Sequence, residues 1–505
     1  MTGQAVKQAP GFILSAFRLG LLGLAASLLG FMREILIVRK FGASPVTDAY
    51  IAAYSVPLLF FSLSFGSGMS LALVPRLSAQ HADSPPLADR SFGEFLSIAM
   101  LPGILLTLFL ILFRAPLIHL FTPGLREPTL AGTFLATLAP AYYLLLAATS
   151  FGVYQCARHA THLFGFLNLI QNGIVVAGLA FMGRTMGIQA LIVFTLAAHA
   201  GSFLFQLAMA KRAGFNERWT PPRRDSGGAR LFLMLLPFLL TLGIGESGTS
   251  LADIVLVRYF GSLLEPGAIT LLSLGNKLAG MPAVLIGAAM GTALLPAASR
   301  LASAGDSAGL ASKFRLAMTT AALLTTPLVI VYFDAPQLVA AVVLTGSGLP
   351  AAQTTELISI LRSYAPAIAG WTYVYVMCSV LAATGSTIYL IVSGIVTLSC
   401  GALMMRFFSL WLGAPGIALA VSAATFLYLA VLAVRLPARL HPGSWTGFLR
   451  PAAIVLLGAA GMHLLVLAFH RSLPPAAIIS VALMFYAIWS IINRGSLHLR
   501  EVFQS

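Results

Sequence analysis

The stretches ILIVRKFG (residues 35–42) and IVLVRYFG (residues 254–261) are two copies of one pattern, with five of eight residues identical and an offset of 219. Each copy follows an acidic residue and precedes a segment with an internal proline, a glycine-rich stretch and a second proline. The acid and the two prolines are Glu34, Pro57 and Pro75 in the first copy and Asp253, Pro282 and Pro296 in the second. This ordered series predicts a duplicated structural unit.

The chain is too apolar for an ordinary soluble protein. Of its 505 residues, 59% are hydrophobic and 9% are charged, and the mean hydropathy is +0.93. A helix needs about 20 apolar residues to cross a bilayer. Fourteen segments meet this requirement, at 11–37, 48–74, 92–113, 131–154, 161–183, 187–210, 229–258, 267–298, 315–333, 355–384, 386–407, 413–435, 448–470 and 474–493. We therefore expect an all-α polytopic membrane protein.

A basic stretch at 211–230, KRAGFNERWTPPRRDSGGAR, follows the sixth predicted span. It divides the chain into a six-helix lobe at 1–210, a linker at 211–228, a second six-helix lobe at 229–435, and two further helices with a tail at 436–505. An even number of helices gives both lobes the same orientation. We expect a pseudo-two-fold axis along the membrane normal, with the substrate path between the lobes. Glycines and prolines should break the second and eighth helices where they line a cavity.

The formal net charge of +15 follows the topology of the spans. Lysines and arginines concentrate on the side that holds both termini and the basic stretch, so the positive-inside rule places both termini in the cytoplasm. The basic stretch is typical of a solvated or headgroup-facing segment, and no nucleic-acid partner is expected. The first span is predicted to be an uncleaved helix, because Arg18 interrupts the apolar core that a signal peptide would need.

Ionisable residues inside the predicted spans are biased toward cations. At membrane depth such groups usually face a protein interior or a watery cavity, because exposing them to lipid costs several kcal/mol. The cations are Arg18, Arg33, Lys277 and Arg362, and the acids are Glu34, Glu246 and Asp253. This composition predicts a cavity that holds an anion.

Three stretches resemble one known family. They are GFMREILIVRKFGASPVTDAY (30–50), LVPRLSA (73–79) and NKLAGMPAVLIGAAMGTALLPAAS (276–299). These runs resemble the MurJ/MviN lipid II flippases of the MOP exporter superfamily, and the resemblance covers both lobes and the count of fourteen helices. It implies a V-shaped transporter with a central cationic cavity that moves an undecaprenyl-pyrophosphate-linked glycan from the inner to the outer leaflet by alternating access.

The resemblance implies Arg33, Asp48, Lys277 and Asn276 as residues of the substrate site. Arg18 is a further candidate for the substrate, because it could compensate for cavity arginines that this chain lacks. From their charge and position, Glu34, Glu246 and Asp253 are candidates for ion coupling or charge balance. Lys277 stands where the family has an arginine, and Asn276 stands where an acid is common. Ser27 and Phe61 replace two further family arginines, and Gly66 replaces a glutamate. Because arginine binds diphosphate oxygens as a fork and lysine as a point charge, these departures leave the identity of the glycan open.

Several of these residues also have structural interpretations. Lys277 could extend its ammonium toward the membrane surface, and Arg33 with Glu34 could form an interfacial pair. Asp48 could be the N-cap of the second helix. Glu246 and Asp253 lie seven residues apart on one helical face and could make a structural polar contact. Arg362, six residues after Glu356, is expected to be structural.

No set of nucleophile, base and oxyanion donors is apparent, and the three cysteines lack metal-ligand spacing. We therefore expect no enzyme activity, metal or cofactor, and a drive from an ion gradient, the membrane potential or consumption of the product. The expected partners are a lipid-linked glycan with a diphosphate, membrane lipids and the cell-envelope synthesis machinery, and the protein is expected to be a monomer of the bacterial cytoplasmic membrane. The alternatives are an exopolysaccharide or O-antigen repeat-unit flippase, an ion-coupled exporter of small molecules, and a non-transporting assembly subunit.

Overall fold

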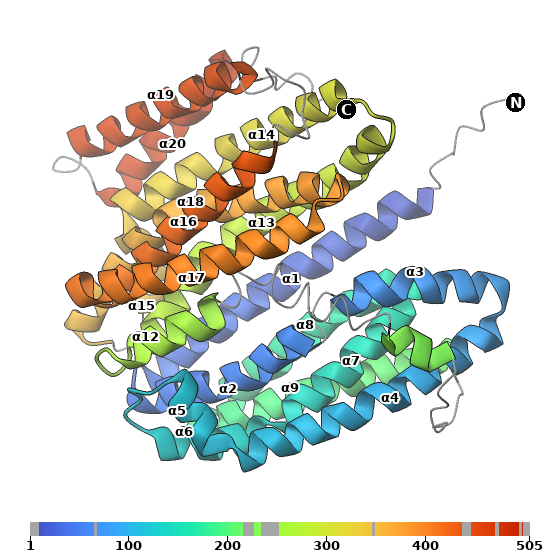
Figure 1. Cartoon of the computed structure of the whole chain (residues 1–505). Helices are drawn as coiled ribbons and strands as arrows, with labels where there is room; N and C mark the ends of the chain where they lie inside the picture. Colours follow the sequence, from blue (N-terminus) through green and yellow to red (C-terminus); the bar gives the residue numbers. More distant parts are fainter. Residues whose placement is uncertain are drawn as a thin grey trace, which may run out of the picture. The chain divides into compact units, whose positions relative to one another are not determined.

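A computed structural model describes residues 10–64, 68–158, 160–215, 227–233, 252–345, 349–436, 446–469, 474–493 and 497. The side chains of residues 10–21, 68, 71, 252–254, 288, 292, 343, 387 and 446–449 lie outside this description. Every regular element among these residues is a helix, which confirms the all-α prediction. The chain forms two compact units (Figure 1). Unit 1 comprises residues 1–41 and 45–243, and unit 2 comprises residues 42–44 and 244–505.

Unit 1 begins with a long helix and packs its remaining helices around an aromatic and aliphatic core. Its labelled helices are α1 (Pro10–Phe41), α2 (Pro45–Ser64), α3 (Gly68–Asp83), α4 (Pro85–Leu112), α5 (Arg114–Phe121), α6 (Pro128–Leu138), α7 (Pro140–Ala157), α8 (Thr161–Met182) and α9 (Ile188–Arg212). The fully buried rings of Phe92, Tyr142 and Tyr154 belong to this core. Within the unit, α8 packs against both α1 and α9.

Unit 2 is built around α13 and α16, which make its most extensive contact. Its helices are the π-helical segment η1 (Ala252–Val257), α12 (Arg258–Ser262), α13 (Ala268–Ser303), α14 (Ser307–Asp334), α15 (Pro336–Leu344), α16 (Ala351–Ala383), α17 (Thr387–Leu412), α18 (Ala414–Arg435), α19 (Thr446–Phe469) and α20 (Pro475–Ile492). Glycines allow the central contact. A Cβ at Gly287 would lie 3.0 Å from the Thr372 Cα, and one at Gly291 would lie 3.2 Å from the Tyr375 carbonyl oxygen.

Among the described residues, twelve helices are long and apolar enough to cross a membrane. The protein is therefore a multi-pass membrane protein. The predicted count of fourteen is not reached within this set. The predicted span 11–37 lies within α1, which is not one of the twelve, and most of the predicted span 229–258 lies outside the described residues.

The two units repeat one order of helices, as the sequence pattern predicts. α4 and α14 each have 28 residues, and each is followed by a short helix, α5 or α15. α17 and α18 begin 226 residues after α8 and α9. The residue before α9 is Gly187 (φ 58°, ψ −140°), and the residue before α18 is Gly413 (φ 63°, ψ −136°). The same backbone conformation, which only glycine adopts readily, thus recurs at equivalent positions.

The predicted local break of the eighth helix is not observed, because α13 runs unbroken through Pro282 and Pro296. A proline lacks the N–H that would bond the carbonyl four residues earlier. For Pro282 that carbonyl belongs to Leu278, and the Tyr332 hydroxyl from α14 donates to it at 2.7 Å. A neighbouring side chain thus satisfies the freed backbone group.

Residues 227–233 are helical and pack on α4 in unit 1. The Gly228 N–H donates to Glu94 Oε2 at 3.2 Å, and Arg90 Nε pairs with the other oxygen of Glu94 at 3.3 Å. A Cβ at Gly228 would lie 2.4 Å from the Phe95 backbone nitrogen. The buried Glu94 carboxylate therefore caps the N-terminus of this segment, where backbone N–H groups need acceptors.

The last two helices, α19 and α20, pack against the end of α14. The apolar contact includes Ile330, Met462 and Ala482. His463 on α19 pairs with Asp334 at 2.8 Å between Nδ1 and Oδ2. These two helices are thus held to unit 2 by both an apolar cluster and a polar contact.

Candidate functional site

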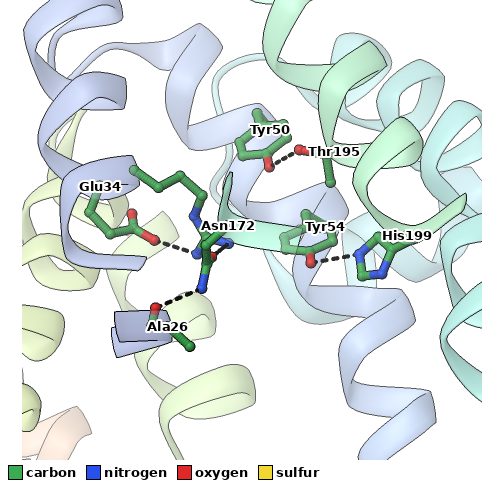
Figure 2. Close-up of polar contacts among 8 residues, drawn as sticks. Ala26, Glu34, Tyr50, Tyr54, Asn172, Thr195 and His199 are labelled. Atoms are coloured by element: carbon green, nitrogen blue, oxygen red, sulfur yellow. Dashed lines mark hydrogen bonds and ion pairs between the residues drawn. The ribbon is translucent and has the colours of Figure 1, made fainter. Parts of the chain in front are cut away.

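Unit 1 contains a polar cluster formed by side chains of α1, α2, α8 and α9. It begins where α8 approaches α1 closely. Gly30 makes this possible, because a Cβ there would lie 3.1 Å from Asn172 Nδ2. The Asn172 amide nitrogen donates to the Ala26 carbonyl at 3.1 Å (Figure 2). A side chain of α8 is thereby bonded to the backbone of α1.

Arg33 lies one turn beyond Gly30 on α1 and has two partners. Its Nη2 donates to Glu34 Oε1 at 2.7 Å, and its Nη1 donates to Asn172 Oδ1 at 3.1 Å. The Arg33 and Glu34 side chains are 21% and 12% exposed. Neighbours in a helix sequence do not share a face, so this pair forms because both side chains are long enough to turn toward each other. The cation is therefore half-buried, charge-balanced and held from two helices.

Arg33 still has donors to offer. Its Nε is buried and has no hydrogen-bond partner among the described residues. A guanidinium carries five N–H donors and no acceptor, and two of its nitrogens already donate one bond each. The group can therefore keep both protein partners while it donates to a further acceptor, such as a ligand oxygen or a water.

A second group of bonds joins α2, α8 and α9. Tyr50 Oη lies 2.8 Å from Thr195 Oγ1, and Tyr54 Oη lies 2.9 Å from His199 Nε2 (Figure 2). Gln171 Nε2 lies 3.2 Å from His199 Nδ1. His199 is 2% exposed, and both of its ring nitrogens therefore have a polar partner from another helix.

The equivalent positions of unit 2 do not repeat these side chains. The residues 226 positions after Asn172, Thr195 and His199 are Leu398, Val421 and Thr425. Thr425 keeps its hydroxyl within its own helix, where it donates to the Val421 carbonyl at 2.8 Å. The order of the helices is thus duplicated. Among the described residues, however, this polar cluster occurs in unit 1 only.

The family model described as "Lipid II flippase MurJ" matches residues 37–488. The chain belongs to the MurJ family. This membership confirms the resemblance that the sequence stretches predict.

Individual MurJ proteins are distant relatives of the chain. It is 26% identical over 291 residues to the lipid II flippase MurJ of Burkholderia cenocepacia, covering 54% of each chain. It is 24% identical over 295 residues to the probable lipid II flippase MurJ of Buchnera aphidicola, covering 57% of this chain and 56% of that protein. A longer match, to the probable lipid II flippase MurJ of Vibrio cholerae, is 23% identical over 441 residues and covers 84% and 81%. In the first two alignments the chain spans about half the length of its curated relatives.

Solved structures support the MurJ fold. A structure described as lipid II flippase MurJ in an inward closed conformation has a TM-score of 0.79 at 18% identity, covering 94% of this chain and 99% of that one. An outward-facing multidrug resistance MATE transporter of the MOP superfamily has a TM-score of 0.60 at 15% identity, covering 88% and 96%. At these identities the likeness concerns the fold alone.

The predicted cavity residues of this MurJ-family chain are distributed over both units. Lys277 is exposed on α13 and lies outside the apolar core of unit 2, and Asn276 is half-buried beside it. Arg18 lies on α1 and Asp253 in η1, but their side chains are outside the description, and Glu246 lies wholly outside the described residues. Among the described side chains of the predicted set, Arg33 and Glu34 form an ion pair.

Three other predicted positions have defined surroundings. Asp48 is 4% exposed and lies in the first turn of α2, so the N-cap interpretation is wrong. The helix begins earlier because Pro45 suits the first helical position. The Ser27 hydroxyl donates to the Gly23 carbonyl within its own helix at 2.8 Å, and Phe61 packs on the core of unit 1. Neither replaces the charge of the family arginine.

Arg362 has a structural contact, as the sequence predicts. Its Nε donates to the Phe333 carbonyl on α14 at 2.9 Å. The residues that sequence reasoning missed are Asn172, Gln171, Tyr54 and His199. A signal was available, because an adjacent glutamine and asparagine in one apolar span and a histidine in the next are costly at membrane depth unless they have partners.

Proposed function

We propose that this protein is a flippase that moves lipid II, a peptidoglycan precursor on an undecaprenyl diphosphate carrier, from the inner to the outer leaflet by alternating access. The observation that carries this proposal is the match of the MurJ family model over residues 37–488. The relatives that support it are named lipid II flippases or probable lipid II flippases. The protein acts in the bacterial cytoplasmic membrane with both termini in the cytoplasm, where the positive-inside rule places them.

Arg33 supplies the first contact to the diphosphate in this proposal. A guanidinium donates to phosphate oxygens in a fixed fork geometry, and its charge makes each bond stronger than a neutral one. The two protein partners of Arg33 leave donors on the same group for the ligand. Because Glu34 stays beside Arg33, its carboxylate repels the bound diphosphate and weakens binding, which permits release as well as capture.

Lys277 supplies a second cation from unit 2. Its side chain is exposed on α13 and lies outside the apolar core of unit 2. Arg18, Asp48 and Asn276 are further candidates for contact with the substrate, and Glu246 and Asp253 are candidates for ion coupling or charge balance. No cofactor takes part, and the drive is an ion gradient, the membrane potential or consumption of the product.

The test is transport by the purified full chain in proteoliposomes. Fluorescent lipid II is placed in both leaflets, and a membrane-impermeant quencher reports the fraction that reaches the outer leaflet with time. A flippase exchanges the inner pool, whereas Arg33→Ala at equal abundance should exchange it no faster than empty vesicles. A second arm uses an undecaprenyl-diphosphate-linked exopolysaccharide unit. Exchange of that lipid without exchange of lipid II would overturn the assignment of the glycan.

A further inference from the structure

We propose that Asn172 is a positioning residue that sets the orientation of the Arg33 guanidinium for the diphosphate. This inference rests on the proposed function, because it assigns a role at the same site. It adds a residue on α8 to a set of candidates that the sequence placed on other helices.

The contact of Asn172 with α1 has two separate ends. Its Nδ2 donates to the Ala26 carbonyl, and its Oδ1 accepts from Arg33 Nη1, both at 3.1 Å. Ala26 and Arg33 lie seven residues apart, which is about two turns of helix. The side chain is therefore anchored to the backbone at one end and holds the guanidinium at the other.

Glu34 alone would not fix the guanidinium. It lies next to Arg33 on the same helix, so the two long side chains can move together through several rotamers. A second partner on another helix removes that freedom, because Nη1 and Nη2 then point at fixed acceptors. With both nitrogens held, the plane of the guanidinium is defined, and so is the direction of its remaining donors.

Packing alone does not explain an amide at this position. The equivalent residue of α17 is Leu398, so the same helix of unit 2 is built without one. An amide at membrane depth costs free energy unless its groups are bonded, and both bonds of the half-buried Asn172 go to α1. Gly30 also keeps open the space that Asn172 fills, since a Cβ there would be 3.1 Å from its nitrogen. The site is therefore shaped for this residue and its contact with Arg33.

The experiment is a double-mutant cycle with Asn172→Leu, Arg33→Lys and the combined variant. Binding of lipid II to the full chain in nanodiscs is measured for each, together with the thermal midpoint of the same preparation. Hydrogen bonds to a charged group contribute enough that each single variant should bind roughly tenfold more weakly than the native chain. Because Asn172 acts through Arg33, the combined variant should bind within about twofold of Arg33→Lys alone.

The matched control is Asn168→Ala, which removes the same residue type one turn earlier on α8, at an exposed position. It should leave binding unchanged. If Asn172→Leu lowers the yield of folded protein, Asn172→Ala takes its place in the cycle. Losses of affinity that add in the combined variant, or native affinity of both Asn172 variants, would overturn the positioning role.

The outcomes separate this inference from the proposed function. If Arg33→Lys weakens binding and Asn172→Leu does not, the positioning role fails while the role of Arg33 stands. If the native chain does not bind lipid II, both fail together. Native affinity of Arg33→Lys removes the role of Arg33 and, with it, any role for Asn172 that acts through it.

Discussion

Arg33 is a cation whose charge the protein has already balanced through Glu34. The two groups lie 2.7 Å apart, and both side chains are largely buried. A balanced pair binds an anion less tightly than a free cation would, because the carboxylate repels the anion while the guanidinium attracts it. At the scale of the residue, the acid therefore controls affinity, although it offers the anion nothing to bind.

Glu34→Gln tests this control. The amide keeps an oxygen that accepts from Arg33 but removes the negative charge, so the net charge of the pair rises by one. We expect lipid II to bind several-fold more tightly, on the order of 1 kcal/mol, and transport to slow because release is slower. Binding in nanodiscs and exchange in proteoliposomes measure the two effects. Unchanged affinity would show that Glu34 is only a structural partner of Arg33.

Lys277 allows a test of charge without a change in side-chain length. Lys277→Met keeps the extended apolar stem and removes the ammonium, and loss of a charge-assisted contact of about 1.5–3 kcal/mol should abolish complementation of a strain that lacks its own lipid II flippase. Lys277→Arg should retain activity because the charge remains. Membrane abundance of each variant is the control. Native flipping by Lys277→Met would show that the lysine is a structural residue that extends toward the membrane surface.

At the scale of the element, the helical segment 227–233 is fixed to α4 by a contact that only glycine permits. A Cβ at Gly228 would meet backbone atoms, 2.4 Å from the Phe95 nitrogen and 2.6 Å from the Glu94 carbonyl carbon. Backbone atoms cannot turn aside as a side chain can. The Glu94 cap and this close approach therefore depend on each other.

Gly228→Ala should detach the segment and lower stability by about 1–3 kcal/mol, the usual cost of forcing an extra methyl into a packed contact. Limited trypsin digestion should then cleave at Arg223 and Arg224 faster than in the native chain, and the thermal midpoint should fall. Gly23→Ala is the matched control, because a Cβ at Gly23 meets nothing within 4 Å. Equal cleavage rates in the two variants would refute the dependence.

At the scale of the whole molecule, the positive-inside rule predicts that the linker faces the cytoplasm and that the loop after Asp334 faces outward. Cysteine labelling can test this after Cys156, Cys378 and Cys400 are replaced by serine. In spheroplasts, a membrane-impermeant maleimide should modify Gln337→Cys and leave Arg223→Cys unmodified. Permeabilisation should then expose Arg223→Cys. Labelling of Arg223→Cys before permeabilisation would reverse the predicted orientation.

The sequence predicts the duplicated helices and the family because both depend on patterns that repeat along the chain. It predicts the Arg33–Glu34 pair for the same reason, since the two residues are neighbours. Asn172 was missed because its partner lies 139 residues away and only the packing of α8 on α1 brings them together. Asp48 is not the N-cap because Pro45, which suits the first helical position, begins the helix earlier.

The unbroken course of α13 has a mechanical consequence. The backbone group that Pro282 frees is bonded by a hydroxyl from another helix, so bending at this position breaks one side-chain bond and leaves the hydrogen-bond ladder of α13 intact. Such bonds in membranes contribute roughly 0.6 kcal/mol on average. The resistance of α13 to bending at Pro282 therefore depends on whether α14 keeps Tyr332 in place. A shift of α14 that breaks this bond would make α13 easier to bend at Pro282.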